Sequence, residues 1–300
     1  MKRIMKWLLL IVLIIGAAYY WLLVDNRPGV ATRTIDIAAL RQAANSIGGA
    51  KPDAVAVEVI SQRKLPATLM VAGGGWGDGG IAIQSFQVGS GDASVIIDSG
   101  FSRASAEGMG VDSYNEAAQM RVNAAMRRAA AIVVTHEHLD HIGGVLEAPD
   151  WKALLPKAFI TREQFDHPEI SQPVNWPVGS RDTFKPLNYD GVRAIAPGVV
   201  LVKAPSHTPG SQLVFVQLAN GREYLFMGDI SSMDRNWREM RARSRLVGDL
   251  LVDENRDAVF GWLSAFNALA VANPDLTLVP SHDGEAIARL IKAGAIRQGM

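Results

Sequence analysis

The segment 135–144, Thr-His-Glu-His-Leu-Asp-His-Ile-Gly-Gly, concentrates four potential metal ligands in six positions: His136, His138, Asp140 and His141. It follows the apolar run 131–134, which predicts a buried strand. A single histidine in a polar loop is usually just solvated. Three imidazoles held together without a metal lose hydration and repel one another when they charge. We therefore predict a metal site at the end of this strand, with zinc, iron or manganese favoured over calcium or magnesium.

Three further candidate ligands share one property, which is that each comes just after a predicted strand. They are His207, Asp229 and His282, and the strands before them are residues 199–203, 223–227 and 276–280. Ligands at strand ends on one edge of a sheet can converge although they are far apart in sequence. The remaining histidine, His167, lies in the irregular loop 162–190 and is predicted to be a solvated loop residue.

Composition narrows the chemistry. The chain has 300 residues, 48% of them hydrophobic, which is enough for one large core. Thirty basic residues balance thirty acidic ones, so the protein has no net positive charge to attract nucleic acid. We therefore expect a small-molecule substrate. The absence of cysteine excludes disulfides, thiolate nucleophiles and cysteine-based metal sites. It also agrees with an oxidising compartment.

The N-terminus carries a candidate membrane helix. Residues 7–24 contain no charge, and basic residues precede them at positions 2, 3 and 6. Eighteen residues just span a hydrocarbon core, and Trp7, Tyr19, Tyr20 and Trp21 stand near its ends, where interfacial aromatics belong. We predict a single-pass anchor in the cell (inner) membrane, with the remaining chain on the periplasmic or extracellular side. The alternatives are a signal peptide cleaved near residues 16–18, which would give a secreted protein, and a buried core helix.

Hydrophobic periodicity and turn residues predict an α/β protein. Residues 1–24 form the anchor or signal peptide, 25–53 a linker with an amphipathic helix from residue 34, and 54–300 the main domain. Besides the four strands already given, strands are predicted at residues 54–60, 67–71, 81–88, 93–97, 159–161 and 213–218. Helices are predicted at residues 113–128, 284–293 and in two segments of 235–270 around Gly248. The buried face of the helix at 113–128 is assigned to Ala117, Met120, Ala124 and Ala125.

Taken in order, these motifs resemble those of the metallo-β-lactamase superfamily of metal-dependent hydrolases, over about residues 54–293. The resemblance rests on His136-x-His138-x-Asp140-His141, Ser-His-Thr-Pro-Gly-Ser at 206–211, Gly228-Asp229, His282 and an early Asp98 after a strand. It implies a four-layer αβ/βα sandwich of two mixed sheets. It also implies two metal ions, usually zinc. His136, His138 and His207 would hold the first, Asp140, His141 and His282 the second, and Asp229 would bridge them.

The resemblance further implies hydrolysis of an ester, lactone, thioester or amide-type bond. Two ions that share a water lower its pKa to about 7, so that a bridging hydroxide is available as nucleophile. Asp140 is the candidate catalytic residue, orienting the nucleophile or passing on its proton. Members with a redox di-iron centre carry a carboxylate where His138 stands, so zinc hydrolysis is favoured. The 22-residue spacing from His207 to Asp229 is similar to that of acyl-homoserine lactonases, whose tyrosine three residues after the bridging aspartate is Ser232 here.

Two other functions are compatible with the same motifs, namely a phosphodiesterase or nuclease and a non-catalytic metal-binding sensor. The complete ligand set argues against the sensor, and the balanced charge argues against a nucleic-acid substrate. Specificity is assigned to three segments without motifs: the glycine-rich tip 72–80 with Trp76 as a candidate cover, the loop 162–190 and the helices of 235–270. Arginines at 235, 238, 241, 243 and 245 are read as a solvated face, with lipid head groups or an acidic substrate as alternatives.

Overall fold

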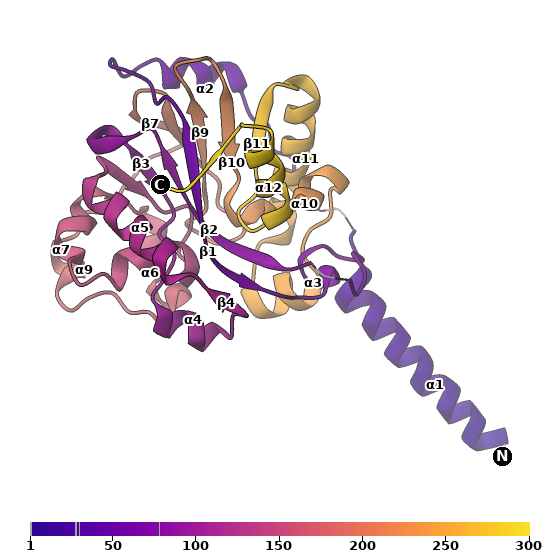
Figure 1. The fold of residues 1–300 in the computed structure, drawn as a ribbon. Helices are drawn as coiled ribbons and strands as arrows, with labels where there is room; N and C mark the ends of the chain where they lie inside the picture. Colours follow the sequence, from indigo (N-terminus) through magenta and orange to yellow (C-terminus); the bar gives the residue numbers. More distant parts are fainter. Residues whose placement is uncertain (1, 28, 30, 78) are drawn as a thin grey trace.

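A computed structural model describes all residues except 1, 28, 30 and 78. Two β-sheets pack face to face, and helices cover the outer face of each (Figure 1). Both sheets contain parallel and antiparallel pairs. The predicted four-layer αβ/βα sandwich of two mixed sheets is therefore confirmed.

The first sheet is built around the long hairpin of β1 and β2, whose strands pair antiparallel. In spatial order it contains β12 (Arg297–Gln298), β1 (Val55–Arg63), β2 (Ile81–Val88), β3 (Val95–Ile97), β5 (Ala131–Val133) and β6 (Ala158–Phe159), with β4 (Ser113–Tyr114) also paired to β1. The second sheet contains β11 (Leu276–Val279), β10 (Glu223–Phe226), β9 (Gln212–Gln217), β8 (Val199–Lys203) and β7 (Val192–Ala196). Strand β7 is not among the predicted strands.

Helices join the strands and cover the sheets. The α-helices are α1 (Lys2–Tyr19), α2 (Ile37–Ala44), α3 (Ala67–Met70), α4 (Arg103–Met109), α5 (Glu116–Arg128), α6 (Leu139–Leu146), α7 (Trp151–Leu154), α8 (Arg162–Asp166), α9 (Ser180–Thr183), α10 (Asp234–Glu239), α11 (Arg256–Ala272) and α12 (Gly284–Lys292). The 3₁₀ segments are η2 (Gly91–Ala93), η3 (Leu155–Lys157), η4 (Pro168–Ser171) and η5 (Gly228–Ser231), and the π-helical segments are η1 (Tyr20–Val24) and η6 (Leu246–Val252).

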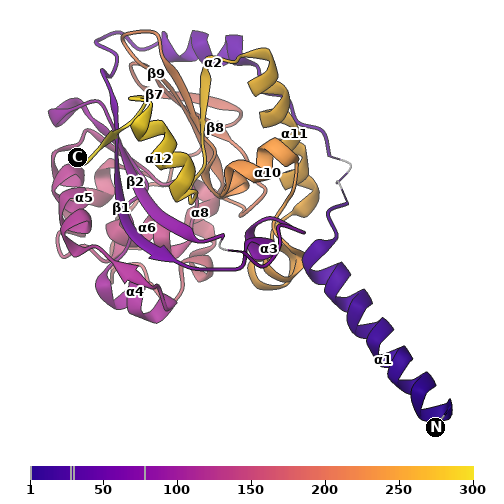
Figure 2. The ribbon, with the colours of Figure 1, turned by 45° about the vertical axis from the view of Figure 1, so that its right-hand side comes forward.

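Three hydrophobic clusters fill the three interfaces between the four layers. Side chains that alternate along β8 contribute to two of these clusters. Val199 and Leu201 face the other sheet, whereas Val200 and Val202 face α2 and α11. Figure 2 shows α2 and α11 along the outside of the second sheet. Helices α5 and α6 pack on the outer face of the first sheet. Both sheets are thus held rigidly, which fixes the edge where their strands end.

The predicted strand at 67–71 is wrong, because residues 67–70 form the short helix α3. The chain folds back on itself there, since Ala67 N donates to the Gly77 carbonyl and Thr68 N to that of Gly75. The partner of β1 is therefore the strand at 81–88, and residues 64–80 form the tip of this hairpin.

Two helix predictions also need correction. In α5 the buried residues are Ala118, Gln119, Val122, Ala125 and Met126, while Met120 is 59% exposed. Of the predicted set, Ala125 is buried as expected; alanines lie on several faces of this helix, so local pattern did not determine which face meets the sheet. In the region 235–270 the breaks lie before Leu246 and after Val252, and Gly248 lies inside the π-helical η6.

The N-terminal helix projects from the domain (Figures 1 and 2). Residues Arg3–Val24 are long and apolar enough to cross a membrane, and none of the most apolar window is buried against the protein. The alternative of a buried core helix is thereby excluded for this structure. Helix α2, in contrast, buries Leu40 and Ala44 in the core beside the second sheet.

Candidate metal centre

The strand ends that precede the candidate ligands meet at one edge of the sandwich. Strands β3 and β5 run parallel, as do β10 and β11, so each pair ends on the same side. The turns after β5, β8, β10 and β11 then bring together all seven side chains that the motifs singled out, in two groups. One group is His136, His138, His207 and Asp229, and the other is Asp140, His141 and His282.

In the first group three imidazole nitrogens face one another. His136 Nε2 lies 2.9 Å from His138 Nδ1, and His207 Nε2 lies 3.1 Å from the same atom. The His207 and His136 side chains are buried, and His138 is less so because it stands at the start of α6. These are nitrogen atoms with lone pairs to donate, gathered at the separation that one shared cation requires.

In the second group two imidazoles meet a carboxylate. His141 Nε2 lies 3.3 Å from His282 Nε2, and Asp140 Oδ2 is 3.6 Å from the former and 3.4 Å from the latter. The three side chains are almost entirely buried. Nitrogen and carboxylate oxygen together form a donor set suited to a transition-metal ion.

Asp229 contacts both groups, with one oxygen toward each. Its Oδ2 is 3.5 Å from His207 Nε2, whereas its Oδ1 is 2.9 Å from His282 Nε2 and 3.4 Å from His141 Nε2. Ser281 Oγ donates to Oδ1 at 2.5 Å. The carboxylate therefore lies between the two sets of nitrogen atoms.

Acceptors outside the two groups engage the Nδ1 atom of three imidazoles. The pairs are His141 with Asp98 Oδ2 at 2.8 Å, His207 with Glu254 Oε2 at 3.0 Å, and His282 with the Ala82 carbonyl at 3.0 Å. An Nδ1–H that donates outward leaves the Nε2 lone pair of a neutral imidazole pointing into the centre. Imidazole nitrogens and carboxylate oxygens therefore converge within each group, so these residues fit metal ions.

Asp98 is fixed in place by the turn it occupies. Its φ is +60°, a left-handed conformation that few residues other than glycine adopt. Its carboxylate accepts hydrogen bonds from Thr135 N at 2.7 Å and Thr135 Oγ1 at 2.9 Å, besides His141. This residue, expected from the resemblance, therefore orients an imidazole and also ties β3 to the turn after β5.

Arg243 is the main element of the centre that the sequence did not reveal. It was assigned to a solvated face, but its side chain is only 4% exposed. Its Nη2 lies 2.9 Å from Asp229 Oδ2 and also contacts Ser232 Oγ, while its Nη1 lies 3.1 Å from Glu254 Oε2. The assignment is wrong because two buried carboxylates, those of Asp229 and Glu254, offset the desolvation of this guanidinium, and nothing in the sequence pattern connects Arg243 with them.

Glu137, which stands between two histidines of the motif, joins this turn to the one that carries His207. The Thr208 hydroxyl donates to Glu137 Oε2 at 2.6 Å, and Gly210 N donates to Oε1 at 2.9 Å. Burial raises the pKa of Glu137, and these hydrogen bonds partly offset that effect. Glu137 therefore holds the two histidine-bearing turns in register.

Burial and neighbouring charges divide the imidazoles into two classes. Burial lowers the pKa of His136 well below its ordinary value, that of His138 to about 3, and that of His207 as well. Burial also acts to lower the pKa of His141 and His282, but the nearby carboxylates outweigh it. Asp140, Asp98 and Asp229 raise the pKa of His141, and Asp229 and Asp140 raise that of His282. The first group is thus neutral, and the second attracts positive charge.

This difference predicts that the two groups bind zinc with different pH dependence. Because their pKa values are raised, protons compete with a metal ion for His141 and His282, so zinc affinity there should rise more steeply with pH than in the first group. The first group carries no such protons, and its affinity should change little over the same range. Zinc calorimetry of the full chain in buffers of different ionisation enthalpy counts the protons released at each step.

A His167→Ala variant is the control for these titrations. His167 lies outside both groups, is 43% exposed in its side chain and pairs with Glu169, as predicted for a solvated loop histidine. Its removal should leave both binding steps unchanged. Equal proton release in the two steps of the unmodified protein would contradict the assignment.

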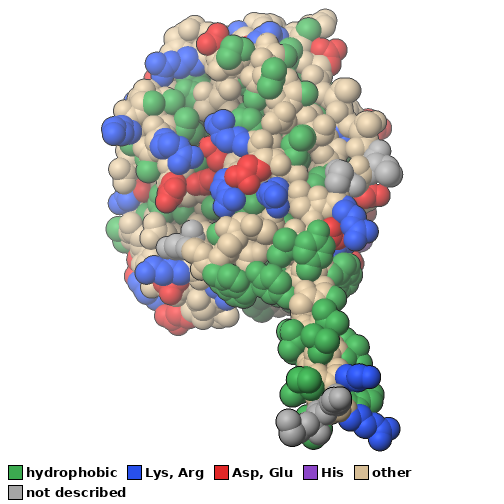
Figure 3. All heavy atoms as spheres, turned by 90° about the vertical axis from the view of Figure 1, so that its right-hand side faces the viewer, with side chains coloured by type: hydrophobic (Ala, Val, Ile, Leu, Met, Phe, Trp, Pro, Cys, Tyr) green, Lys and Arg blue, Asp and Glu red, His purple; other side chains and the backbone are tan. Residues whose placement is uncertain are grey.

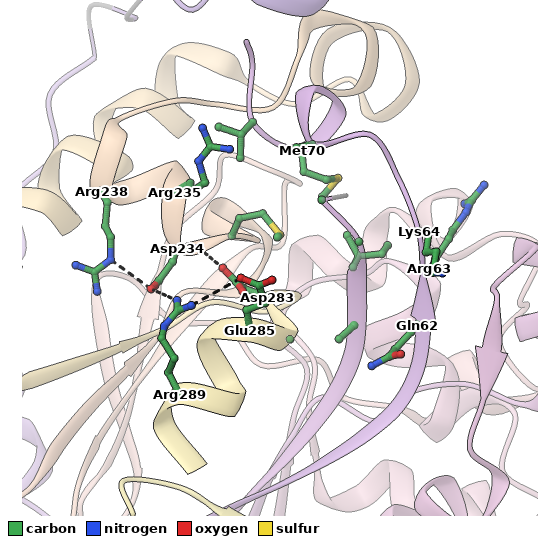
Figure 4. Close-up of a pocket in the computed structure, with 18 residues that line it drawn as sticks. Gln62, Arg63, Lys64, Met70, Asp234, Arg235, Arg238, Asp283, Glu285 and Arg289 are labelled. Atoms are coloured by element: carbon green, nitrogen blue, oxygen red, sulfur yellow. Dashed lines mark hydrogen bonds and ion pairs between the residues drawn. The ribbon is translucent and has the colours of Figure 1, made fainter. Parts of the chain in front are cut away.

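A cavity of about 500 Å³ lies beside the second group, between the β1–β2 hairpin and helices α10 and α12 (Figure 4). Ala82 and Asp283 line it, and these flank His282 in space and in sequence. Five basic and three acidic side chains contribute to its wall. Figure 4 shows Arg238 and Arg289 both directed at Asp234, at 3.2 and 3.0 Å. The wall of the cavity is therefore lined by paired charges of both signs.

Comparison with known proteins agrees with the geometry. A model of the metallo-beta-lactamase superfamily matches residues 79–282. A solved quorum-quenching N-acyl homoserine lactone lactonase is 16% identical, with a TM-score of 0.58, covering 78% of this chain and 94% of its own. An N-acyl homoserine lactone hydrolase, solved with the product N-hexanoyl-L-homoserine at its catalytic metal center, is 15% identical with a TM-score of 0.59, covering 80% and 96%.

A further solved structure, hydrolase AbOPH of the beta lactamase superfamily, is 16% identical with a TM-score of 0.55, covering 81% of this chain and 92% of its own. These identities show a shared fold. A search of curated proteins gave no match. The family match spans most of the domain and includes the whole set of converging side chains. The chain therefore belongs to the metallo-beta-lactamase superfamily, and it is a metal-dependent hydrolase.

Proposed function

We propose that the protein is a dinuclear zinc hydrolase that cleaves an ester, lactone, thioester or amide-type bond. The observation that carries the proposal is the position of Asp229, whose two oxygens face different groups of ligands. His136, His138 and His207 would hold one ion, Asp140, His141 and His282 the other, and Asp229 would bridge them. Bound zinc supplies Lewis-acid polarisation of the acyl oxygen and a water of lowered pKa.

Charge balance supports two ions over one. Four carboxylates contact the ligand imidazoles, namely Asp98, Asp140, Asp229 and Glu254, and one buried guanidinium, Arg243, opposes them. With neutral imidazoles the sum is −3, so one divalent ion would leave −1, whereas two ions would give +1, which a single hydroxide would bring to zero. Buried charges without compensation are strongly unfavourable. Imidazole nitrogen in the first group favours zinc over manganese, and a histidine at position 138, where the redox di-iron members carry a carboxylate, favours zinc over iron.

The protein's own residues have distinct tasks in this proposal. Asp140 is the catalytic residue that orients the attacking water and takes up its proton. Asp98 and Glu254 fix the orientation of His141 and His207. Arg243 holds the Asp229 carboxylate in place. It also contacts Ser232, which stands where the lactonases carry their tyrosine. The cavity beside His282, which is lined by charged side chains, would receive a polar part of a small-molecule substrate.

We also propose that α1 anchors the chain in the cell (inner) membrane, with the hydrolase domain on the periplasmic or extracellular side. The exposed apolar surface of this helix and the basic residues at its start support insertion in the membrane, and the apolar run that continues past Ala18 supports an uncleaved anchor. Mass spectrometry of the protein from the membrane fraction identifies its N-terminal residue and so distinguishes an uncleaved anchor from a cleaved signal peptide. An N-terminus near residue 18 or beyond, in a soluble fraction, would contradict the anchor.

Metal analysis combined with a substrate screen tests the hydrolase. The purified full chain should hold two equivalents of zinc and hydrolyse at least one class among lactones, thioesters, β-lactams and other amides. Phosphodiesters are included because activity on them alone would replace our proposal with the phosphodiesterase alternative. His136→Ala should lower activity by about 10²-fold or more, because it removes a ligand of the first ion. Full activity in this variant, or a protein without transition metal, would refute the proposal.

A further inference from the structure

The face of the domain around the base of α1 carries exposed apolar side chains. Trp76 at the hairpin tip is 64% exposed, and Leu250 and Leu251 in η6 are 58% and 72% exposed. Figure 3 shows hydrophobic side chains gathered at this base, continuous with those of the projecting helix. We call Trp76, Leu250 and Leu251 the apolar rim. An exposed apolar patch that is continuous with a membrane helix differs from scattered surface leucines, which need no explanation.

The hairpin tip is attached directly to the upper end of the membrane helix. The ring of Trp76 stacks on that of Tyr19 with 6.2 Å between centroids, and its Nε1 donates to Tyr19 Oη at 3.2 Å. Gly73 N and Thr68 Oγ1 donate to the Leu23 carbonyl at 2.8 and 2.7 Å. Trp76 is therefore held at the level of the aromatic residues that end the apolar span, which is where tryptophan and tyrosine meet a membrane interface.

The η6 part of the rim is attached to the same end of the helix through Arg245. This guanidinium lies over the Trp21 ring at 5.6 Å, pairs with the buried Asp25 at 3.0 Å and pairs with Asp249 of η6 at 2.7 Å. The segment that carries Leu250 and Leu251 also begins and ends at the metal centre. Arg243 precedes it and contacts Asp229, and Glu254 follows it and contacts His207.

We propose that the apolar rim rests in the lipid bilayer, so that the hydrolase domain is seated on the membrane surface and does not hang from a free tether. The partner is the boundary between phospholipid head groups and acyl chains on the side where α1 ends. The proposal rests on α1 being a membrane anchor. Contact of the rim with the bilayer would also extend the proposed function. Only the short segment η6 would then separate the metal centre from the bilayer, where an amphiphilic acyl substrate is available.

The absence of cysteine in the chain makes a direct test possible. Single-cysteine variants of the full chain, Leu250→Cys and Gly77→Cys, take an environment-sensitive fluorophore and leave Trp76 and Leu251 in place. Nothing lies within 4 Å of a Cβ at Gly77. Val271→Cys is the matched control, since it is apolar, 80% exposed and at the far end of α11. Ile11→Cys, within α1, reports whether the helix is in the membrane at all.

Labelled proteins are reconstituted in phosphatidylcholine vesicles that contain doxyl-labelled lipids. Rim labels should emit at shorter wavelength than the Val271 label. They should lose more fluorescence to a doxyl group near the top of the acyl chain than to one near its end, because interfacial side chains reach only about 5–10 Å below the head groups. The Ile11 label should respond to both quenchers, and the Val271 label to neither.

Each other outcome is informative. If the rim labels behave like the Val271 label while the Ile11 label is quenched, the rim does not contact the bilayer, although α1 is still a membrane anchor. An unquenched Ile11 label would show that α1 is not in the membrane, and the proposal for the apolar rim would then fail with it. Rim labels that are shielded from aqueous iodide but unaffected by lipid quenchers would indicate a second copy of the chain or another protein on this face, against our proposal. Metal content and hydrolysis, measured on the same samples, show separately whether the hydrolase itself is intact.

Discussion

An Asp229→Ala variant should lose activity by about 10³-fold or more and should no longer hold two metal ions. The reason is that its carboxylate contacts both groups of ligands, so both ions lose a negatively charged ligand together. Metal ions contribute several kcal/mol of transition-state stabilisation, and about 4 kcal/mol corresponds to a factor of 10³. Hydrolysis rates of the full chain, with zinc determined on the same samples, measure the effect.

One further variant separates charge from shape at this position, and a second serves as a control elsewhere in the chain. Asp229→Asn keeps the size of the side chain and removes its charge, so we expect it to lose nearly as much zinc as Asp229→Ala. Asp92→Ala removes an exposed carboxylate remote from the centre and should behave as the unmodified protein. If Asp229→Ala retained two zinc ions at full activity, Asp229 would not bridge them.

Arg243→Met should lower the stability of the domain by about 3–5 kcal/mol, because it leaves two buried carboxylates without their cation. The guanidinium contacts Asp229 and Glu254, and both of these carboxylates are nearly inaccessible to solvent. For a domain of this size the melting temperature should fall by roughly 10 °C. Thermal unfolding of the metal-free full chain in detergent, followed by circular dichroism, measures the shift, because bound metal ions would otherwise replace the guanidinium beside Asp229.

The matched control is Arg238→Met, the same replacement at a guanidinium that is 60% exposed, which should shift the melting temperature by little. The double variant Arg243→Met with Glu254→Gln should recover part of the loss, because it removes one of the two stranded charges. Arg243→Lys should be intermediate, since an ammonium cannot reproduce the planar fork that spans two carboxylates. An Arg243→Met protein as stable as the Arg238→Met control would show that the buried pairs contribute nothing.

The ligand set was predictable because each ligand is marked by local sequence. His136, His138, Asp140 and His141 lie in one short segment, and His207, Asp229 and His282 each follow an apolar run that becomes a strand. Once strands of one sandwich end at a common edge, side chains at those ends must approach one another. Local pattern also predicted β2 and β8 to the residue, because both are bounded by turn residues.

Predictions failed where long-range contacts outweigh local preference. Residues 67–71 are apolar and β-branched enough for a strand, yet hydrogen bonds to the glycine-rich tip turn them into α3. Arg243 has the pattern of a surface residue, since it is one of several arginines at short spacing. Its burial depends on Asp229 and Glu254, and no local signal connects these three positions.

The sequence by itself determined the metal-binding residue types, the α/β class and the apolar N-terminal helix, because ligand type, hydrophobic period and helix length are properties of short segments, and the order of its motifs implied the αβ/βα sandwich by resemblance. Only the tertiary structure decided that Arg243 is buried between Asp229 and Glu254. It also decided that Trp76 and η6 meet the end of α1 beside the metal centre. A buried charge or an exposed apolar side chain acquires its role from neighbours distant in the chain, and only the folded arrangement supplies those neighbours.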